Sequence, residues 1–290
     1  MAAPQSLLDL SRSAAALRYN KPVTIHRRAP LGQVFLTDRR VEERITRALD
    51  LRPDAAVLEI GAGPGNMTRR LAARVARVWA VEVDSGLAAA LRQQFADDPR
   101  VEVLETDILQ LAIGDLVRSA GRDRIRVFGN LPYYITSPCL LRLFQYQEWI
   151  EEIVVMVQKE VAERIVAAPG TADYGLFSVT CQYYTQPALL FSVPPKAFRP
   201  EPQVYSAVVR LRVASQKKTL GIQDERVFWK LVRAAFAQRR KTLVNNWNGM
   251  CDLERLREAL RALGIDPRAR AETLTLAQFA SLQRLLDSRK

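Results

Sequence analysis

The sequence is poor in the residues that build disulfide scaffolds, metal sites and membrane spans. Its three cysteines, Cys139, Cys181 and Cys251, lie far apart without a Cys-x-x-Cys spacing, which argues against a disulfide framework or a zinc site and suits a reducing cytoplasm. The one histidine, His26, stands in the polar run "TIHRRAP", so we interpret it as a surface or linker residue and exclude a histidine-based triad. No apolar run approaches the roughly 18 residues of a membrane span. The N-terminus is also a poor secretory signal, and we therefore expect a cytoplasmic protein with no membrane association.

Acidic residues are fewer than basic ones. Lysine and arginine number 43 against 31 aspartate and glutamate, which gives a formal charge of +12 over 290 residues. Such an excess favours an anionic partner, above all a nucleic acid. A basic surface that is merely solvated is the alternative.

Short apolar runs alternate with helical patterns from about residue 55 to residue 159. Strands are predicted over 55–61, 77–84, 101–107, 124–130 and 150–158, and this alternation is typical of a parallel sheet with crossover helices. Two later β-rich runs, 176–193 and 203–213, are expected to supply closing strands. From residue 226 the pattern is helical. We predict an N-terminal extension (1–28), an α/β domain (29–213) and a small, basic, all-α C-terminal domain (221–290), whose contact with RNA is implied by the family resemblance described below.

The stretch "LEIGAGPGNMT" places Gly61, Gly63 and Gly65 between a predicted strand and a predicted helix. Glycines allow the backbone to bend tightly and to approach a ligand closely. The spacing is not that of the dinucleotide motif Gly-x-Gly-x-x-Gly, and no Gly-Lys-Ser/Thr follows, so neither a hydride-transfer enzyme nor an NTPase is favoured. A tight turn without a ligand remains the alternative.

Carboxylates follow the next two strands. Glu82 lies about 20 residues past the first glycine, where a carboxylate commonly holds a ribose diol. Asp107 is placed to accept a hydrogen bond from an adenine amino group, whereas Asp84 is expected to cap the following helix. A ribose and an adenine site beside a loop with no phosphate to neutralise suit S-adenosylmethionine, with no metal.

The fourth strand ends in "FGNLPYYITSP". Asn130 offers an amide oxygen, and Pro132 leaves the Leu131 carbonyl free, so two acceptors are available for the hydrogens of an aromatic amine. Tyr133 offers a face for stacking a base, and Tyr134 is expected to pack in the core. Two acceptors favour methyl transfer to an exocyclic amine by positioning rather than by a strong base, on a base that is single-stranded or flipped out. A turn with two core tyrosines is the alternative.

With these residues the chain resembles the ribosomal RNA adenine-N6,N6-dimethyltransferase family over about residues 29–290. The resemblance is carried by "LGQVFLTD", "LEIGAGPGNMT", "VEVD", "GNLPYYITSP", "QKEVAERIVAAPGTADYGLFSV", "VPPKAFRPEPQVYSAVVRL" and "FAQRRKTLVNN". It implies a Rossmann-like S-adenosylmethionine-dependent methyltransferase domain. It also implies N6,N6-dimethylation of two adjacent adenosines in the 3′-terminal hairpin loop of small-subunit (16S) ribosomal RNA, performed by a monomer on a pre-ribosomal particle during small-subunit biogenesis. The first four motifs are shared with relatives that methylate large-subunit RNA, whereas the last three point to the small-subunit branch.

The resemblance also implies residue roles. The donor would be held at Gln33, Leu36, Gly61, Gly63, Glu82, Asp107 and Asn130, and the reaction carried by Asn130, Leu131, Pro132, Tyr133 and Phe198. In the family Phe198 would form the second face of a sandwich around the flipped base. Arg239, Arg240 and Lys241, expected at consecutive helical positions, would contact RNA phosphates.

One position departs from the family pattern. Val34 stands where the family usually has an asparagine that helps to bind the donor, and its side chain cannot form a hydrogen bond. We expect the donor to bind more weakly, because only the backbone contacts at Gln33 and Leu36 remain in this segment. This departure keeps open an RNA-binding assembly factor with little or no catalysis. A large-subunit RNA methyltransferase and a DNA adenine methyltransferase are further alternatives, although the latter normally carries Asp-Pro-Pro-Tyr at this motif.

Overall fold

A computed structural model describes residues 34–132 and 134–287. The N-terminal extension expected over 1–28 lies outside the described residues, as do Gln33 and Tyr133. The described chain forms two compact units. One contains residues 34–162 and Pro187–Val213; the other contains Glu163–Gln186 and residues 214–287. The helical unit thus includes residues 163–186 as well as the C-terminal segment, and the domain limits at 213 and 221 stay predictions.

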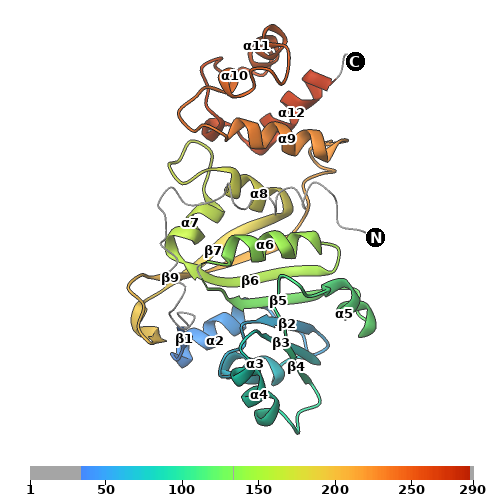
Figure 1. Ribbon diagram of the computed structural model, residues 1–290, viewed down its shortest axis with the longest axis vertical. Coiled ribbons are helices and arrows are strands. Elements are labelled where there is room, and N and C mark those ends of the chain that lie inside the picture. Colours follow the sequence, from blue (N-terminus) through green and yellow to red (C-terminus); the bar gives the residue numbers. More distant parts are fainter. Residues whose placement is uncertain (1–33, 133, 288–290) are drawn as a thin grey trace. The chain divides into compact units, whose positions relative to one another are not determined.

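The first unit is a seven-stranded sheet with helices between its strands (Figure 1). Its elements are β1 (Phe35–Leu36), α2 (Arg39–Ala48), β2 (Ala56–Ile60), α3 (Asn66–Ala72), β3 (Arg77–Glu82), α4 (Ser85–Gln94), β4 (Val101–Glu105), α5 (Ile113–Ser119), β5 (Ile125–Asn130), α6 (Thr136–Gln145), β6 (Ile150–Gln158), β7 (Thr185–Val193), the 3-10 turn η2 (Pro195–Ala197), β8 (Phe198–Arg199) and β9 (Ser206–Val213).

The strand order is β4-β3-β2-β5-β6-β9-β7. Strands β2 to β6 are parallel, and β9 runs antiparallel to β6. The order reverses on either side of β2, so β2 and β5 lie at the switch point, where ligands of such sheets bind beyond the carboxyl ends of the strands. This arrangement confirms the α/β fold predicted from the alternating pattern.

Apolar side chains explain why these strands are central. All five residues of β2 are buried, as expected for a parallel strand that is covered on both faces. Asp38 and Asp84 are the N-cap residues of α2 and α4, and their carboxylates accept main-chain hydrogen bonds of the first turn. The expected capping role of Asp84 is therefore confirmed: its Oδ1 lies 2.9 Å from the Leu87 nitrogen.

The second unit is helical. It contains α8 (Leu176–Tyr184), α9 (Glu225–Ala235), α10 (Leu243–Asn246), α11 (Leu253–Ala262), η3 (Ala271–Thr273) and α12 (Leu276–Asp287), and α7 (Lys159–Val166) leads into it. Its centre is aromatic: Tyr183, Tyr184, Phe228 and Trp229 are fully buried and in mutual ring contact.

The prediction of a strand over 176–193 was wrong in its first half, because residues 176–184 form α8 and only β7 is extended. The buried aromatic residues of α8 imitate a strand composition, but they pack among helices. None of the helices in residues 34–132 and 134–287 has the length and hydrophobicity of a membrane span.

Candidate active site

A pocket of about 200 Å³ opens at the carboxyl ends of the parallel strands. Its walls come from the residues that end or follow β2, β3, β4, β5 and β6, from the segment before α2, and from the start of β9. Those walls comprise Val34, Phe35, Ile60, Gly61, Gly63, Val81, Glu82, Val83, Thr106, Asp107, Ile108, Asn130, Leu131, Pro132, Tyr134, Ile135, Met156, Val157 and Ser206. The predicted strand-end residues Gly61, Glu82, Asp107 and Asn130 are thus brought together.

The glycine loop is tied to the end of β3 by one carboxylate. Glu82 Oε2 accepts from the Gly63 nitrogen at 2.9 Å, and Oε1 accepts from the nitrogens of Val83 and Asp84 at 2.9 and 3.0 Å. Glu82 is buried, so these three main-chain donors stabilise its negative charge. The carboxylate therefore fixes the loop and lines the pocket at the same time.

Gly63 is required at its position. Its φ of +53° is strained for a residue with a side chain, and an added Cβ would lie 3.0 Å from the Phe35 ring. The close contact joins the glycine loop to β1, so both walls of the pocket depend on this residue.

The third strand end supplies a second carboxylate and an apolar surface. Asp107 Oδ1 accepts from the Leu109 nitrogen at 2.9 Å, which leaves Oδ2 able to accept from a ligand. Val83 lines the pocket and is 59% exposed, and Ile108 lines it as well. Val83 and Ile108 could not be predicted as site residues from the sequence, because an apolar residue beside a strand end carries no polar signal.

The amide of Asn130 has a fixed orientation. Its Nδ2 donates to the Val34 carbonyl at 3.2 Å, so Oδ1 is left to accept. Leu131 is held by its own nitrogen, which donates to the Met156 carbonyl at 3.0 Å. Among the residues that the structure describes, no hydrogen bond to the Leu131 carbonyl is found. Two acceptors thus stand free at the end of β5.

Tyr134 does not pack in the core, contrary to the expectation from sequence. Its side chain is 63% exposed and lines the pocket. Partial burial, and then the charges of Asp107 and Glu82, raise the pKa of its hydroxyl. Its neighbour Tyr133 lies outside the described residues, so the expected stacking role of Tyr133 stays a prediction.

Phe198 lies in the core rather than in the pocket wall. It is fully buried, belongs to the cluster formed with Leu36 and Met156, and pairs with Leu36 across β1 and β8. A base sandwiched by Phe198 would require this side chain to leave the core. The structure therefore does not bring Phe198 together with the other predicted catalytic residues.

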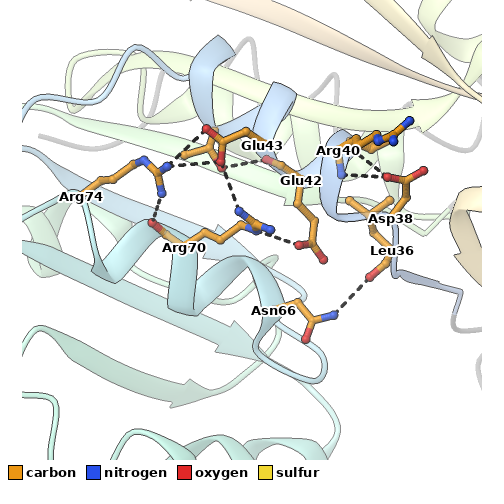
Figure 2. Close-up of polar contacts among 10 residues, drawn as sticks. Leu36, Asp38, Arg40, Glu42, Glu43, Asn66, Arg70 and Arg74 are labelled. Atoms are coloured by element: carbon orange, nitrogen blue, oxygen red, sulfur yellow. Dashed lines mark hydrogen bonds and ion pairs between the residues drawn. The ribbon is translucent and has the colours of Figure 1, made fainter.

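The segment before α2 is anchored to the helix that follows the glycine loop (Figure 2). Asn66 Nδ2 donates to the Leu36 carbonyl at 3.4 Å, and Arg70 Nε lies 2.7 Å from Glu42 Oε2. Arg70 also pairs with Glu43 at 3.2 Å. Since Glu42 is buried and Arg70 is three-quarters buried, this pair is shielded from solvent and fixes α2 against α3.

A second carboxylate, Glu59, lies beneath the glycine loop. It is buried in β2, and its Oε2 has no hydrogen-bond partner among the described residues. Burial raises the pKa of Glu59 to about 8, the Thr68 hydroxyl opposes the shift, and the Glu82 carboxylate adds to it. At this pKa the neutral carboxylic acid is the main form of Glu59 at pH 7, and no pattern in the sequence predicts it.

The three basic residues expected to contact RNA lie in a loop and not on a helix. Helix α9 ends at Ala235, and Arg239, Arg240 and Lys241 follow in an exposed loop. Arg239 donates to the Ala172 carbonyl at 2.8 Å. Their expected consecutive helical positions were wrong, and their role toward RNA stays a prediction.

Within the described residues, no group of three or more histidine, cysteine, aspartate or glutamate side chains is arranged to hold a metal ion. The polar groups of the pocket wall are main-chain groups, two carboxylates, one amide and the hydroxyl-bearing residues Thr106, Tyr134 and Ser206.

Comparisons with known proteins agree with this geometry. The family described as "Ribosomal RNA adenine dimethylase" matches residues 25–288. A "Ribosomal RNA small subunit methyltransferase A" of Koribacter versatilis is 43% identical over 278 residues, which cover 92% of this chain and 96% of that relative. A similarly named protein of Geobacter metallireducens is 43% identical over 268 residues, or 90% of this chain and 96% of the relative.

Solved structures share the fold. The crystal structure of the 23S rRNA methyltransferase ErmE superposes with a TM-score of 0.66 at 26% identity, covering 87% of this chain and 99% of that chain. A dimethyladenosine transferase from Plasmodium falciparum gives a TM-score of 0.73 at 22% identity, covering 86% and 95%. The family match spans nearly the whole chain and includes every described residue of the pocket. The chain belongs to the ribosomal RNA adenine dimethylase family.

Proposed function

We propose that the protein transfers methyl groups from S-adenosylmethionine to the exocyclic nitrogen of two adjacent adenosines near the 3′ end of small-subunit ribosomal RNA. The observation that carries the proposal is the pair of free acceptors at the end of β5, Asn130 Oδ1 and the Leu131 carbonyl, beside the Glu82 and Asp107 carboxylates. Family membership and the names of the curated relatives support the same reaction.

The pocket fits the donor. Asp107 Oδ2 can accept from an adenine amino group, Glu82 can accept from a ribose diol, and Val83 and Ile108 give apolar contact for a ring. The main chain at Gly61 and Gly63 carries no side chain that would obstruct a ligand. We expect these residues, with the main chain at Leu36 and Asn130, to hold the donor.

Asn130 and Leu131 act on the adenine amino group that accepts the methyl group. An adenine amino group is a weak nucleophile because its lone pair is delocalised into the ring. Hydrogen bonds from its two hydrogens to Asn130 Oδ1 and to the Leu131 carbonyl draw the nitrogen toward a tetrahedral shape and direct the lone pair. When bound, the donor supplies a methyl group whose bond to sulfur breaks, its electron pair staying on sulfur, as the nitrogen–carbon bond forms. The amine then loses a proton to solvent.

The target base must leave its stack to reach this pocket. Tyr134, exposed at the pocket, gives an aromatic surface beside the acceptors, and Tyr133 is the further candidate for stacking. A single-stranded or loop adenosine pays the smallest unstacking cost. The preference for a hairpin loop is what the resemblance to the family implies.

The proposal is tested by incubating the protein and tritiated donor with small subunits that lack the modification and, in a separate reaction, with large subunits. Dimethyladenosine in small-subunit RNA, identified by mass spectrometry, is the expected product. Label that enters large-subunit RNA instead would favour the large-subunit alternative. Tight binding of small subunits without label would favour an assembly factor that has lost catalysis.

A further inference from the structure

Three arginines on the exposed face of α2 come close in the fold to two basic residues of the segment between β7 and β9. Arg39, Arg40 and Arg44 are exposed on α2, and Lys196 and Arg199 are exposed around β8. The strand pair β1–β8 joins the segments, because Phe35 lies opposite Arg199 in the register. We call these five residues the α2–β8 basic patch.

Main-chain hydrogen bonds hold the two halves of the patch in a fixed arrangement. The Ala197 carbonyl accepts from the nitrogens of Thr37 and Asp38 at 2.9 and 3.2 Å, and from the Thr37 hydroxyl at 3.2 Å. Phe35, opposite Arg199, lines the pocket. The patch therefore begins at the pocket wall and belongs to the same unit as the pocket.

Several other basic residues of this unit are paired with carboxylates, whereas the patch residues are not. Arg70, Arg77, Arg92, Arg100 and Arg118 each form an ion pair with a glutamate or an aspartate. No ion pair is found between the five patch residues and the described carboxylates.

The nearest acids in sequence form no ion pair with the patch. Asp38 Oδ1 accepts from the nitrogens of Arg40 and Val41 at the start of α2, and its single negative charge leaves the five cations with a net positive charge. Glu201 is exposed and forms no ion pair with a described residue. Figure 2 shows the Arg40 side chain directed away from the network of Glu42, Glu43, Arg70 and Arg74. Unpaired cations on a protein surface repel one another unless an anion binds there.

Two patch arginines are positioned by the protein itself. The Arg44 guanidinium lies over the Phe191 ring, 3.8 Å from its centroid, and Arg199 donates to the carbonyl of Phe198 at 2.8 Å. An arginine that stacks on a ring through its face keeps its edge donors for phosphate oxygens. Both side chains are therefore held in place before a ligand binds.

We infer that the α2–β8 basic patch binds the sugar–phosphate backbone of the RNA strand that leads to the target adenosine. The inference rests on the proposed function for the identity of the RNA, and it assigns to the catalytic unit a phosphate contact in addition to Arg239, Arg240 and Lys241. Its effect is to fix the strand next to the pocket, whereas base contacts select the adenosine.

The test is the salt dependence of RNA binding. The variant Arg39→Gln/Arg40→Gln/Lys196→Gln removes three exposed charges, and these side chains form no hydrogen bond or ion pair within the described residues. The control Arg92→Gln/Arg100→Gln/Arg118→Gln removes three charges from exposed arginines that are paired with Glu105, Asp98 and Asp115. Equilibrium binding of unmodified small subunits is measured from about 0.05 to 0.2 M salt.

For the patch variant, the plot of log association constant against log salt concentration is expected to be less steep than for the wild type, by roughly 2–3 in the magnitude of the slope. Its affinity at 0.1 M salt is expected to be lower on the order of 100-fold. The control is expected to change neither. Equal slopes for the wild type and the patch variant, or equal losses in patch variant and control, would overturn the inference. Donor binding by calorimetry reports separately on the fold. Because the readout is binding, a wild type that binds small subunits but fails to methylate them would contradict the proposed function and leave this inference standing.

Discussion

The side-chain amide of Asn130 donates a hydrogen bond to the main-chain carbonyl of Val34 at 3.2 Å. The bond connects the end of β5 to the segment before β1, 96 residues earlier in the chain. It settles which end of the amide faces the pocket, since Nδ2 is occupied and Oδ1 is free. Val34 thus contributes through its backbone, although its side chain forms no hydrogen bond.

Replacing Asn130 by alanine should damage catalysis much more than RNA binding. The variant loses the acceptor for the amine but keeps every phosphate contact, so we expect kcat to fall on the order of 10²–10³-fold. The RNA dissociation constant should change less than about twofold. Single-turnover methylation and filter binding on the same particles separate the two effects.

Asn130→Asp is the informative companion. The aspartate keeps an acceptor but cannot donate to the Val34 carbonyl, so its orientation is lost. Its kcat is expected to lie between those of the wild type and the alanine variant. If the aspartate variant kept wild-type activity, the orientation of the side chain by Val34 would be unimportant. If RNA affinity fell as much as kcat in the alanine variant, Asn130 would act in RNA binding rather than in the reaction.

Restoring the family residue at position 34 should strengthen donor binding. Val34 lines the pocket, and Val34→Asn adds an amide there without changing the carbonyl that holds Asn130. One additional hydrogen bond is worth about 0.5–1.5 kcal/mol, so the affinity is expected to rise roughly 2- to 10-fold. Calorimetric titration with S-adenosylmethionine measures the change. An unchanged affinity would mean that the missing amide has no part in donor binding in this chain.

Much of the pocket could be predicted from sequence because parallel strands bring their carboxyl ends to one edge. Gly61, Glu82, Asp107 and Asn130 each end or follow a clear apolar run, so their common location follows from the fold class. The Asn130–Val34 bond could not be predicted in the same way. It depends on a main-chain carbonyl that lies outside the alternating pattern.

Residues outside regular strands were harder to place. The position of Tyr134 depends on the path of the chain after Pro132, which no periodicity describes. Arg239 was expected on a helix because the preceding pattern is helical. Helix α9 ends at Ala235, however, and the Ala235 carbonyl accepts a hydrogen bond from Asn246 Nδ2 at 2.6 Å. That long-range bond favours an end to the helix, and local propensity gives no sign of it.

Replacing Gly63 by alanine should abolish tight donor binding. The new Cβ would meet the Phe35 ring at 3.0 Å with the backbone at a φ of +53°. We expect the donor affinity to fall at least about 10-fold, because relief of this contact moves either the loop or β1, both of which line the pocket.

Gly121→Ala is the matched control for Gly63→Ala. Gly121 also has a positive φ, +63°, but nothing lies within 4 Å of an added Cβ and the residue is remote from the pocket walls. It should lose stability through backbone strain, of about 1–3 kcal/mol, while the donor affinity is retained. Equal donor affinities for the two variants would show that the Phe35 contact is unimportant.

Glu59→Gln should flatten the dependence of stability on pH. In the unfolded chain Glu59 has an ordinary pKa of 4.5, and in the folded protein its pKa is about 8. Between these values the folded state keeps a proton that the unfolded state releases, so the free energy of unfolding falls as the pH rises, by up to about 1.4 kcal/mol per pH unit. Above pH 8 both states are ionised and this loss stops.

Glutamine has nearly the same shape and never ionises, so the variant should be more stable than the wild type at pH 8 and similar to it near pH 4.5. Denaturant unfolding at several pH values measures this difference, and parallel curves for the two proteins would show that Glu59 does not hold a proton in the folded state.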